Sequence, residues 1–340
     1  YGDAVVTSSG RRLYREPGIA FPGEPNLPVW DANPEAFEID PDALGGDHVD
    51  LEAGSRFTAE GVLAFAYGDY QLWPATLEVV DSEPVPIEPG AHRPDRFTVA
   101  SQNCYRLART GGDVPYDDRL SKLTAQIRNV LAAPSILAVQ EVAELSVLQD
   151  LADRIELDDP GLVYSPHLVE GNDPSGIDVG FLVRDGVAVL GVRQIGAAVR
   201  FTWDQSLLFD RPPMVLETRH GDLDLTVVVV HLRSLSGIDD AGGAGERVRR
   251  KRFEQSEWIA GWVQDHQLQR ADDGLLLVGD FNAFEFSDGY VDVLGQVTGR
   301  PDPAGALIPA EQVVVPPLTN AALSLPAGER YSYVYRGSAE

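Results

Sequence analysis

Residues 274–282 read Gly-Leu-Leu-Leu-Val-Gly-Asp-Phe-Asn, a pattern that predicts both a structural element and a candidate site. Four consecutive apolar residues bounded by glycine are typical of a short strand that is buried on both faces. The strand ends in Asp280 and Asn282. Side chains two residues apart on a strand point the same way, so this carboxylate and this amide are expected to share one space. The alternative is a simple turn, because Asp and Asn are common turn residues.

Length and composition indicate a globular protein with a sizeable core. The chain has 340 residues, 44% of them hydrophobic and 24% charged, which suits one large domain and a smaller one. No apolar run is long enough to cross a bilayer, so no membrane span is predicted. The chain begins at Tyr1, which favours a secreted, extracellular protein whose leader has been removed, with a cytoplasmic protein as the alternative.

The charge balance limits the possible partners. The formal net charge is −26, from 53 acidic and 27 basic residues. Such a field repels polyanions at long range and argues against a protein that coats DNA. It is compatible with an enzyme that holds one phosphate through a divalent cation and a local group of arginines. The only cysteine, Cys104, excludes an intramolecular disulfide and is interpreted as a buried packing residue.

The chain divides into two regions with different patterns. Residues 1–80 are rich in Pro, Gly and Asp and are predicted to form a small β-rich accessory module, for which a barrel is one possible form. Two β segments in residues 56–74 join at Gly68-Asp69. The aromatic residues of this hairpin are interpreted as packing residues in preference to a nucleic-acid-binding surface. Residues 81–95 contain four prolines and are predicted to be an extended linker.

From residue 96 onward, helical and strand patterns alternate. Helices are predicted at 116–133, 144–157, 246–266 and 288–295. Strands are predicted at 97–104, 135–142, 176–184, 187–195, 214–219, 223–231 and 274–282, with a long loop at 301–326 and a last strand from Tyr331. Helices with antiparallel hairpins between them favour stacked sheets covered by helices over a doubly wound parallel sheet. The predicted fold class is α/β (α+β).

Four predicted strands end in polar residues. The list comprises Asn103, Gln140-Glu141, His231 with Ser234, and Asp280 with Asn282. Each has a structural explanation of its own as a cap, a surface residue, a satisfied histidine or a turn residue. Four such endings in one domain favour a common pocket. One glutamate with amides and water suits Mg²⁺ or Mn²⁺, with Ca²⁺ as a third candidate. Zinc is disfavoured because no Cys/His ligand spacing occurs.

The order of these motifs is similar to that of the endonuclease/exonuclease/phosphatase superfamily, the fold of pancreatic deoxyribonuclease and the abasic-site endonucleases. The motifs are Asn103 in its strand, Gln140-Glu141, residues 176–184, His231-Leu232-Arg233-Ser234, and Gly279-Asp280-Phe281-Asn282. The resemblance covers about residue 95 to the end. It implies a four-layer α/β/β/α sandwich of two mixed sheets in a catalytic domain at 96–340. It also implies a metal-dependent phosphodiesterase that hydrolyses nucleic acid, DNA before RNA.

Carried over by position, the resemblance gives each residue a role. Glu141 would bind the metal, and Asn103 would assist the metal and the phosphate. His231 would hydrogen-bond the scissile phosphate, Asp280 would orient or activate the nucleophile, and Asn282 would hold the phosphoryl oxygens.

Further residues are implied on the substrate side of the site. Asp178, Arg184 and Ser234 are the candidates there. The basic run at 247–252 is interpreted as a solvated helix face, with a phosphate-backbone contact as the alternative.

The closer likeness is to bacterial extracellular nucleases, in which a region like residues 61–74 precedes the catalytic domain. In those relatives an Asp-His pair follows a segment like residues 330–335, whereas this chain stops at Glu340. We interpret the catalytic domain as lacking its C-terminal end, which would severely reduce activity. Two other functions stay open: a phosphatase or lipid phosphodiesterase (sphingomyelinase-like) of the same superfamily, and a non-catalytic binding or scaffold protein with an incomplete site. No protein partner is predicted.

Overall fold

The computed structural model of the chain describes most of the predicted catalytic domain and parts of the N-terminal module. The described residues are 4–7, 36–46, 49, 51, 55–66, 69–81, 96–111, 114–238, 240–325, 334–335 and 338–339. The predicted linker therefore lies outside the described residues, apart from Asp81, and so do Tyr67 and Gly68 of the predicted hairpin turn.

The N-terminal strands form a separate four-stranded sheet. Its strands are β1 (Ala4–Thr7), β2 (Ala36–Ile39), β3 (Arg56–Ala66) and β4 (Asp69–Asp81), in the order β1-β2-β4-β3. The hairpin β3–β4 confirms the predicted pair, but β4 continues past the expected end at Pro74. The described strands make an open sheet and not the closed barrel that was one possible form. Tyr70 packs edge-on against Phe65 across the hairpin, although it is 62% exposed.

Two further sheets, here called the first and second sheets, form the body of the molecule. The first contains β5 (Val99–Leu107), β6 (Ile136–Val142), β7 (Tyr164–Leu168) and β8 (Asp178–Arg184), in the order β5-β6-β8-β7. The second contains β9 (Ala188–Gln194), β10 (Met214–His220), β11 (Leu223–His231) and β12 (Gly274–Asp280), in the order β12-β11-β10-β9. The pairs β5–β6 and β11–β12 are parallel and the other pairs are antiparallel, so both sheets are mixed.

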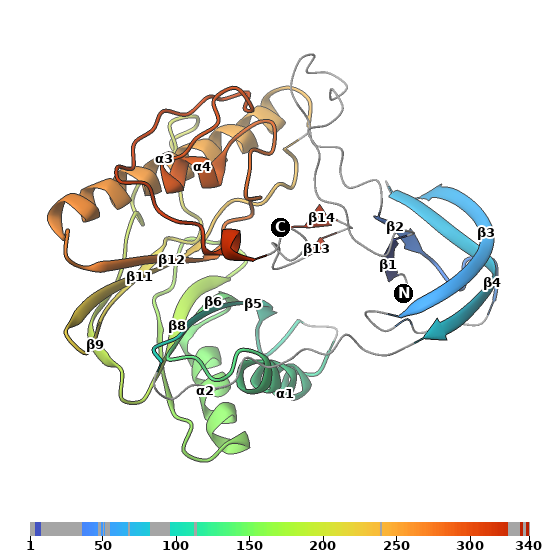
Figure 1. Cartoon of the computed structure of the whole chain (residues 1–340), viewed down its shortest axis with the longest axis horizontal. Helices are drawn as coiled ribbons and strands as arrows, with labels where there is room; N and C mark the ends of the chain where they lie inside the picture. The colour runs from blue at the N-terminus through green and yellow to red at the C-terminus, as the bar shows by residue number, and fades with distance from the viewer. Residues whose placement is uncertain are drawn as a thin grey trace.

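The two sheets stack face to face, and helices cover both outer faces (Figure 1). The core between the sheets contains Ile136, Ala138, Val179, Phe181, Met214, Leu216, Val227 and Val229. The helices α1 (Tyr116–Ala125) and α2 (Leu145–Asp158) pack on the first sheet. The helices α3 (Gly243–Gln269) and α4 (Val293–Thr298) pack on the second. This arrangement confirms the predicted four-layer α/β/β/α sandwich.

Two predicted helices differ from the structure. The helix predicted at 116–133 is α1 followed by a π-helical turn at Gln126–Val130. The helix predicted at 288–295 is wrong. Asp288 accepts backbone N–H groups from Tyr290 and Val291 in a turn, and Asp292 then caps α4 by accepting from the N–H of Gly295. Because Asp288 forms a turn, the helix begins at Val293, five residues later than predicted.

Several short elements were not predicted. The strand β7 carries a proline and buries only Tyr164 and Leu168 fully, so it lacks a clear alternation; proline is tolerated because β7 is an edge strand. A 3₁₀ turn (Ala321–Ser324) lies in the predicted loop. The strand β13 (Val334–Tyr335), which falls within the last strand predicted from Tyr331, pairs with β14 (Ser338–Ala339), which was not predicted. In the described part of the chain, no helix is both long enough and apolar enough to cross a membrane.

Candidate active site

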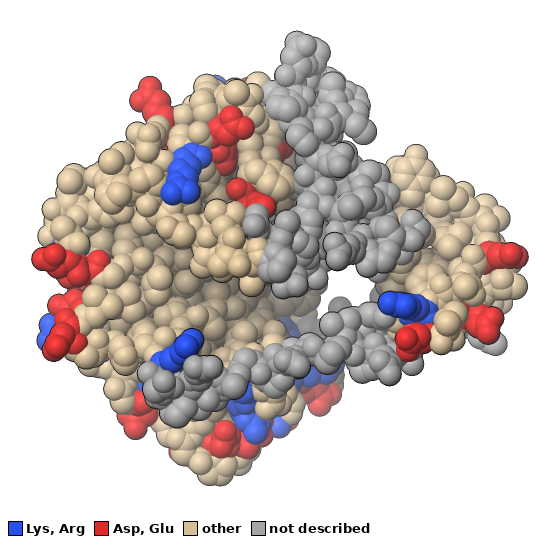
Figure 2. Space-filling view, viewed as in Figure 1, with Lys and Arg blue, Asp and Glu red and all other residues tan. Residues whose placement is uncertain are grey.

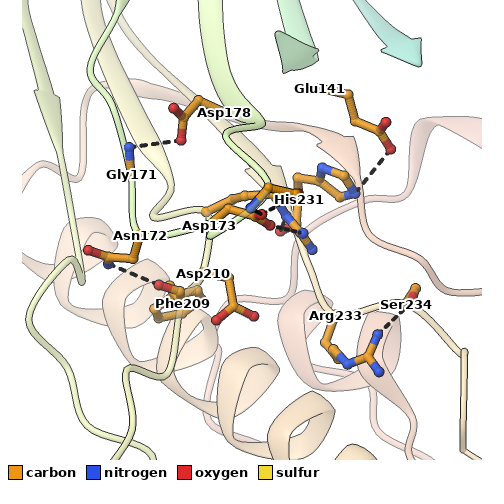
Figure 3. A network of polar contacts seen from close by, with 12 residues as sticks. Glu141, Gly171, Asn172, Asp173, Asp178, Phe209, Asp210, His231, Arg233 and Ser234 are labelled. Atoms are coloured by element: carbon orange, nitrogen blue, oxygen red, sulfur yellow. Dashed lines mark hydrogen bonds and ion pairs between the residues drawn. The ribbon is translucent and has the colours of Figure 1, made fainter. Parts of the chain in front are cut away.

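Four polar side chains from four different strands meet at one end of the core between the sheets. Asn103 Nδ2 donates to Glu141 Oε1 at 3.2 Å and to Asp280 Oδ2 at 3.0 Å. His231 Nε2 lies 3.9 Å from that glutamate oxygen and 3.8 Å from that aspartate oxygen. Figure 3 shows His231 turned toward Glu141. The convergence expected from the strand ends is therefore present for these four residues.

Strand alternation places three of the four residues on the inner face. Successive side chains of a strand point to opposite faces, so residues of the same parity share a face. Asn103, His231 and Asp280 have the parity of Val99, Val229 and Val278, which pack in the core between the sheets. The parallel register of β11 and β12 also pairs His231 directly with Asp280.

Glu141 reaches the same face through a bulge in β6. Gln140 has the inner parity and accepts a hydrogen bond from Ser101, so regular alternation would turn Glu141 outward. Instead Glu141 has a φ of 60°, and the pairing with β8 shifts between Gln140 and Val142. Such a backbone costs about 1 kcal/mol for a residue with a Cβ, and strain of this kind concentrates at functional sites. The bulge is what makes the carboxylate face the other three groups.

The turn that follows Asn103 fixes the side chains of two site residues, Asn103 and Glu141. Tyr105 and Arg106 have φ values of 49° and 52°. Their backbone N–H groups donate to Asn103 Oδ1 at 2.8 Å and to Glu141 Oε2 at 2.9 Å. The guanidinium of Arg119 donates to the carbonyl oxygens of Cys104, Tyr105 and Arg106. Arg119, which the sequence analysis did not single out, thus supports the turn that orients two site residues.

Asn282 supports the site through its backbone and its amide. Its N–H donates to Asp280 Oδ1 at 2.8 Å, and its Nδ2 donates to the carbonyl of Leu232 at 3.0 Å. The first bond leaves Asp280 Oδ2 directed toward Asn103 and His231. The second ties the end of β12 to the end of β11. In this structure the amide of Asn282 is a positioning group for the two strand ends.

His231 is a neutral imidazole at physiological pH. Its side chain is 5% exposed, and burial lowers its pKa to about 4, with Arg211 adding to the decrease and Asp280 opposing it. The separations of 3.8 and 3.9 Å exceed hydrogen-bond distance, and a neutral imidazole forms no ion pair with the two carboxylates. A neutral imidazole next to two carboxylates is suited to donate one hydrogen bond to an oxygen that enters the site.

The donor set is compatible with a hard divalent cation. Glu141 and Asp280 each direct one carboxylate oxygen toward Asn103. No group of three or more His, Cys, Asp or Glu side chains gathers as a metal cage in the described part of the chain. Mg²⁺ commonly binds one or two carboxylates and takes its other ligands from water and substrate phosphate, so two carboxylates suffice. The residues therefore fit the cation that the sequence predicts, with substrate or water completing the shell.

Asp178 and Arg184 lie at opposite ends of β8. Asp178 pairs with Val142 next to the site, is 5% exposed and accepts from the N–H of Gly171. Burial raises its pKa to about 6. Arg184 lies at the other end of the strand, where it donates to the carbonyl of Ala133 at 2.8 Å. The structure brings Asp178 near the site and leaves Arg184 away from it.

The basic run at 247–252 is only in part the solvated helix face that was expected. Arg249, Lys251 and Arg252 are 6%, 3% and 1% exposed. Arg249 donates to the carbonyl of Ile238, Lys251 pairs with Asp210 and Arg252 pairs with Asp288. Only Arg247 and Arg250 are on the solvated face, with side chains 38% and 50% exposed.

Arg252 is a further supporting residue that the sequence analysis missed. Its Nη1 donates to the carbonyls of Arg233 and Asn282, at 2.6 and 2.8 Å, and Nη2 donates to Asp288. One buried guanidinium thus joins the segments that follow β11 and β12. The sequence of the basic run did not indicate this role of Arg252, because its residues look alike in sequence but lie in four different environments.

Comparison with known proteins gives likenesses of structure only. No protein-family profile matches the chain, and no curated protein matches it. TDP2 from C. elegans aligns at a TM-score of 0.40 with 20% identity, covering 56% of this chain and 48% of that chain. A beta hairpin deletion mutant of beta toxin from Staphylococcus aureus aligns at 0.43 with 17% identity, covering 60% and 73%.

A third structure, D. rerio TDP2 complexed with single strand DNA product, aligns at a TM-score of 0.39 with 18% identity. It covers 63% of this chain and 66% of that chain. The chain spans about half the length of C. elegans TDP2. The stacked sheets and their helices show, independently of these alignments, the architecture implied by the sequence resemblance to the endonuclease/exonuclease/phosphatase superfamily.

Proposed function

We propose that this protein is a metal-dependent phosphodiesterase that hydrolyses nucleic acid, with DNA as the first candidate substrate, by in-line attack of water. The convergence of Asn103, Glu141, His231 and Asp280 on one point carries the proposal. Two carboxylates, an amide and a neutral imidazole are the groups that a cation-bound phosphodiester and an attacking water require.

The cation would be held by Glu141, with Mg²⁺ as the first candidate and Mn²⁺ or Ca²⁺ as alternatives. When bound, it would neutralise charge on the phosphate and stabilise the leaving oxygen. Glu141 is preorganised for this role, because the N–H of Arg106 already holds its second oxygen.

The remaining steps follow from the chain's own groups. Asp280 has Oδ1 fixed by the N–H of Asn282, so Oδ2 is available to orient the water and to accept its proton. His231, being neutral, donates from Nε2 to a non-bridging phosphoryl oxygen. Asn103 Nδ2 donates to the same phosphate as charge develops on it. Asn282 and Arg119 act by holding these groups in place.

The preference for nucleic acid is supported by the sequence motifs. Residues 61–74 resemble the region that precedes the catalytic domain in bacterial extracellular nucleases. A lipid phosphodiesterase or a phosphatase would use the same four groups, so only substrate tests separate these activities.

The experiment is plasmid nicking by the purified full-length protein with Mg²⁺ and with EDTA. Sphingomyelin and 4-nitrophenyl phosphate are assayed in parallel. Nicking that requires Mg²⁺ and is lost in Glu141→Ala supports the proposal. Turnover of sphingomyelin or the phosphomonoester with intact plasmid would replace it by the lipid or phosphatase activity. Absence of turnover on all three substrates would contradict catalysis and favour a binding protein.

A further inference from the structure

The segment after His231 lies among buried cations, and three of them have a carboxylate partner. Arg211 pairs with Asp173 at 2.8 Å, Lys251 with Asp210 at 2.8 Å, and Arg252 with Asp288 at 2.9 Å. Arg233 has no carboxylate partner among the described residues. A half-buried guanidinium without a counter-ion is unusual in a chain with a net charge of −26. On the face shown in Figure 2, exposed acidic groups are scattered with isolated basic groups between them.

The position of Arg233 is fixed by neighbouring groups. Its N–H donates to Gln255 Oε1 at 2.8 Å, and its carbonyl accepts from Arg252 at 2.6 Å. Its Nη1 donates to Ser234 Oγ at 2.7 Å and its Nη2 to the carbonyl of Ser236 at 2.8 Å; Figure 3 shows the bond to Ser234. Ser234, expected to contact substrate, instead orients this arginine.

These bonds leave part of the guanidinium free. The group has five N–H donors, and the two bonds to Ser234 and Ser236 use two of them. The Nε–H and one N–H on each terminal nitrogen remain. Two parallel N–H groups of this kind match two oxygens of a phosphate.

The surrounding charges favour an anion at this place. Burial lowers the pKa of Arg233, and the nearby Arg211, Arg252 and Arg247 lower it further, while Asp210 opposes them. Burial is the largest of these causes, so a phosphate next to Arg233 would offset the cost of burying its charge. The acidic surface elsewhere on the chain would not hold a polyanion by long-range attraction, so a local contact of this kind has more to contribute.

We propose that Arg233 binds a second phosphate of the substrate, next to the one that is cleaved, and so favours polynucleotides over substrates with a single phosphate. This inference rests on the proposed function and specifies its substrate class. In Figure 3 Arg233 lies on the opposite side of His231 from Glu141, and its side chain bonds to Ser234 and Ser236, not to the residues assigned to the scissile phosphate. A polynucleotide offers a second phosphate to this guanidinium, whereas a substrate with one phosphate offers none.

The first test measures binding without cleavage. A labelled single-stranded oligonucleotide is titrated in EDTA over a salt series, by fluorescence anisotropy, against wild type, Arg233→Gln, Arg233→Lys and Arg250→Gln. Arg250 is the matched control, since it is an exposed arginine paired with Glu246 on α3. Arg233→Gln should bind roughly ten- to a hundredfold more weakly, because a charge-assisted hydrogen-bond pair is lost. The slope of log affinity against log salt should fall by about 0.7.

Arg233→Lys keeps the charge and loses the paired geometry. Arg233→Lys should keep the salt slope of the wild type and lose part of the affinity for the oligonucleotide. It also serves as a control for a folding defect in Arg233→Gln. Thermal unfolding of both variants checks for such a defect directly. Arg250→Gln should bind like wild type. Equal losses for Arg233→Gln and Arg250→Gln, or unchanged binding by Arg233→Gln, would overturn the proposal.

The second test compares substrates with one and with many phosphates. Arg233→Gln should raise KM for a DNA oligonucleotide about tenfold or more and leave kcat/KM for bis(4-nitrophenyl) phosphate close to wild type. Proportionate losses on both substrates would contradict a second-phosphate contact. Failure of the wild type to hydrolyse either substrate would contradict the proposed function, while the binding titration would still decide the role of Arg233.

Discussion

Asn103 and Asp280 are 177 residues apart in the chain and are joined by a hydrogen bond of 3.0 Å between Nδ2 and Oδ2. They come from different sheets. Asn103 lies on β5 and Asp280 on β12, and each strand is the edge strand of its sheet. The candidate site is therefore formed where two edge strands meet, at the open end of the core between the sheets.

Removing the charge of Glu141 should reduce catalysis without unfolding the protein. Glu141→Gln keeps the side-chain shape and its acceptor for the N–H of Arg106, so the fold should be retained. Phosphodiester hydrolysis should fall by about two to three orders of magnitude, because one charged group of the site is lost. Mg²⁺ or Mn²⁺ should raise the Tm of the wild type by binding the folded state, and this increase should be absent in Glu141→Gln.

The matched control for this variant is Glu144→Gln. Glu144 pairs with Arg109 on the surface, and its side chain is 47% exposed. It should keep both activity and the cation-dependent Tm. A Glu141→Gln protein that retains the metal-dependent Tm would show that the cation binds elsewhere.

Replacing the amide between the two carboxylates should make stability depend on a cation. Asn103→Asp places a third carboxylate against Glu141 and Asp280, and it removes two hydrogen bonds. Like charges in one site repel, so Tm should fall without divalent cations and recover substantially when Mg²⁺ or Mn²⁺ is added. Thermal unfolding with and without the cation measures this directly.

Asn172→Asp serves as the comparison for Asn103→Asp. The amide of Asn172 donates to the carbonyls of Ala197 and Phe209, away from the carboxylate pair. This variant should also lose stability, but added cation should not restore it. Equal recovery of both variants would indicate a general salt effect and argue against a cation site at Asn103.

Removing the guanidinium of Arg252 should destabilise the protein strongly. Arg252 is 1% exposed, and it joins the carbonyls of Arg233 and Asn282 to the carboxylate of Asp288. Arg252→Ala leaves a buried carboxylate without its ion-pair partner, which should cost about 4 kcal/mol. Urea unfolding measures the loss.

Arg247→Ala is the surface counterpart on the same helix. Arg247 pairs with Asp204 through a side chain that is 38% exposed, and an exposed, solvent-screened pair contributes little to stability. Similar losses for the two variants would contradict the assignment of Arg252 as a buried clamp.

Ionisation of Asp178 should lower stability as pH rises. Burial raises its pKa to about 6, so the folded protein keeps this proton between about pH 4 and pH 6, where the unfolded chain has already released it. Stability is therefore lost over that window as pH increases. In Asp178→Asn this loss is absent, so the variant should gain on the wild type between pH 4 and pH 7, by at most about 3 kcal/mol.

Unfolding of both proteins at pH 4 and pH 7 tests this prediction. Asp185→Asn, at an exposed position just beyond the other end of the same strand, should show no such pH-dependent difference. A constant difference between Asp178→Asn and wild type across the two pH values would rule out the expected titration. In that case burial next to the site would not raise the pKa of Asp178.

Part of the site could be predicted from periodicity and chain order. Asn103, His231 and Asp280 each follow an apolar strand, and each has the parity of the valines that fill the core between the sheets. Alternation along a strand is a local property, so the sequence by itself determines which side chains face inward. Periodicity also predicted the buried strands and the covering helices, whereas the resemblance to the superfamily implied the four-layer class.

Other features depend on contacts that no local pattern records. Glu141 faces inward only because of a bulge with a φ of 60°, held by the N–H of Arg106 across the turn. The basic run at 247–252 looks uniform, yet Lys251 and Arg252 are buried because Asp210 and Asp288 approach them from elsewhere in the chain.

The order of apolar and polar residues along each strand determined the faces, the layers and the groups available for chemistry, because side-chain direction alternates with every residue. Only the tertiary structure decided which groups meet, because pairing of charges and placement of strand ends require segments far apart in sequence to come within a few ångströms. Arg233 is the clearest instance. Its sequence neighbours are ordinary, and its lack of a counter-ion becomes visible only when Asp173, Asp210 and Asp288 are each seen to be paired with another cation.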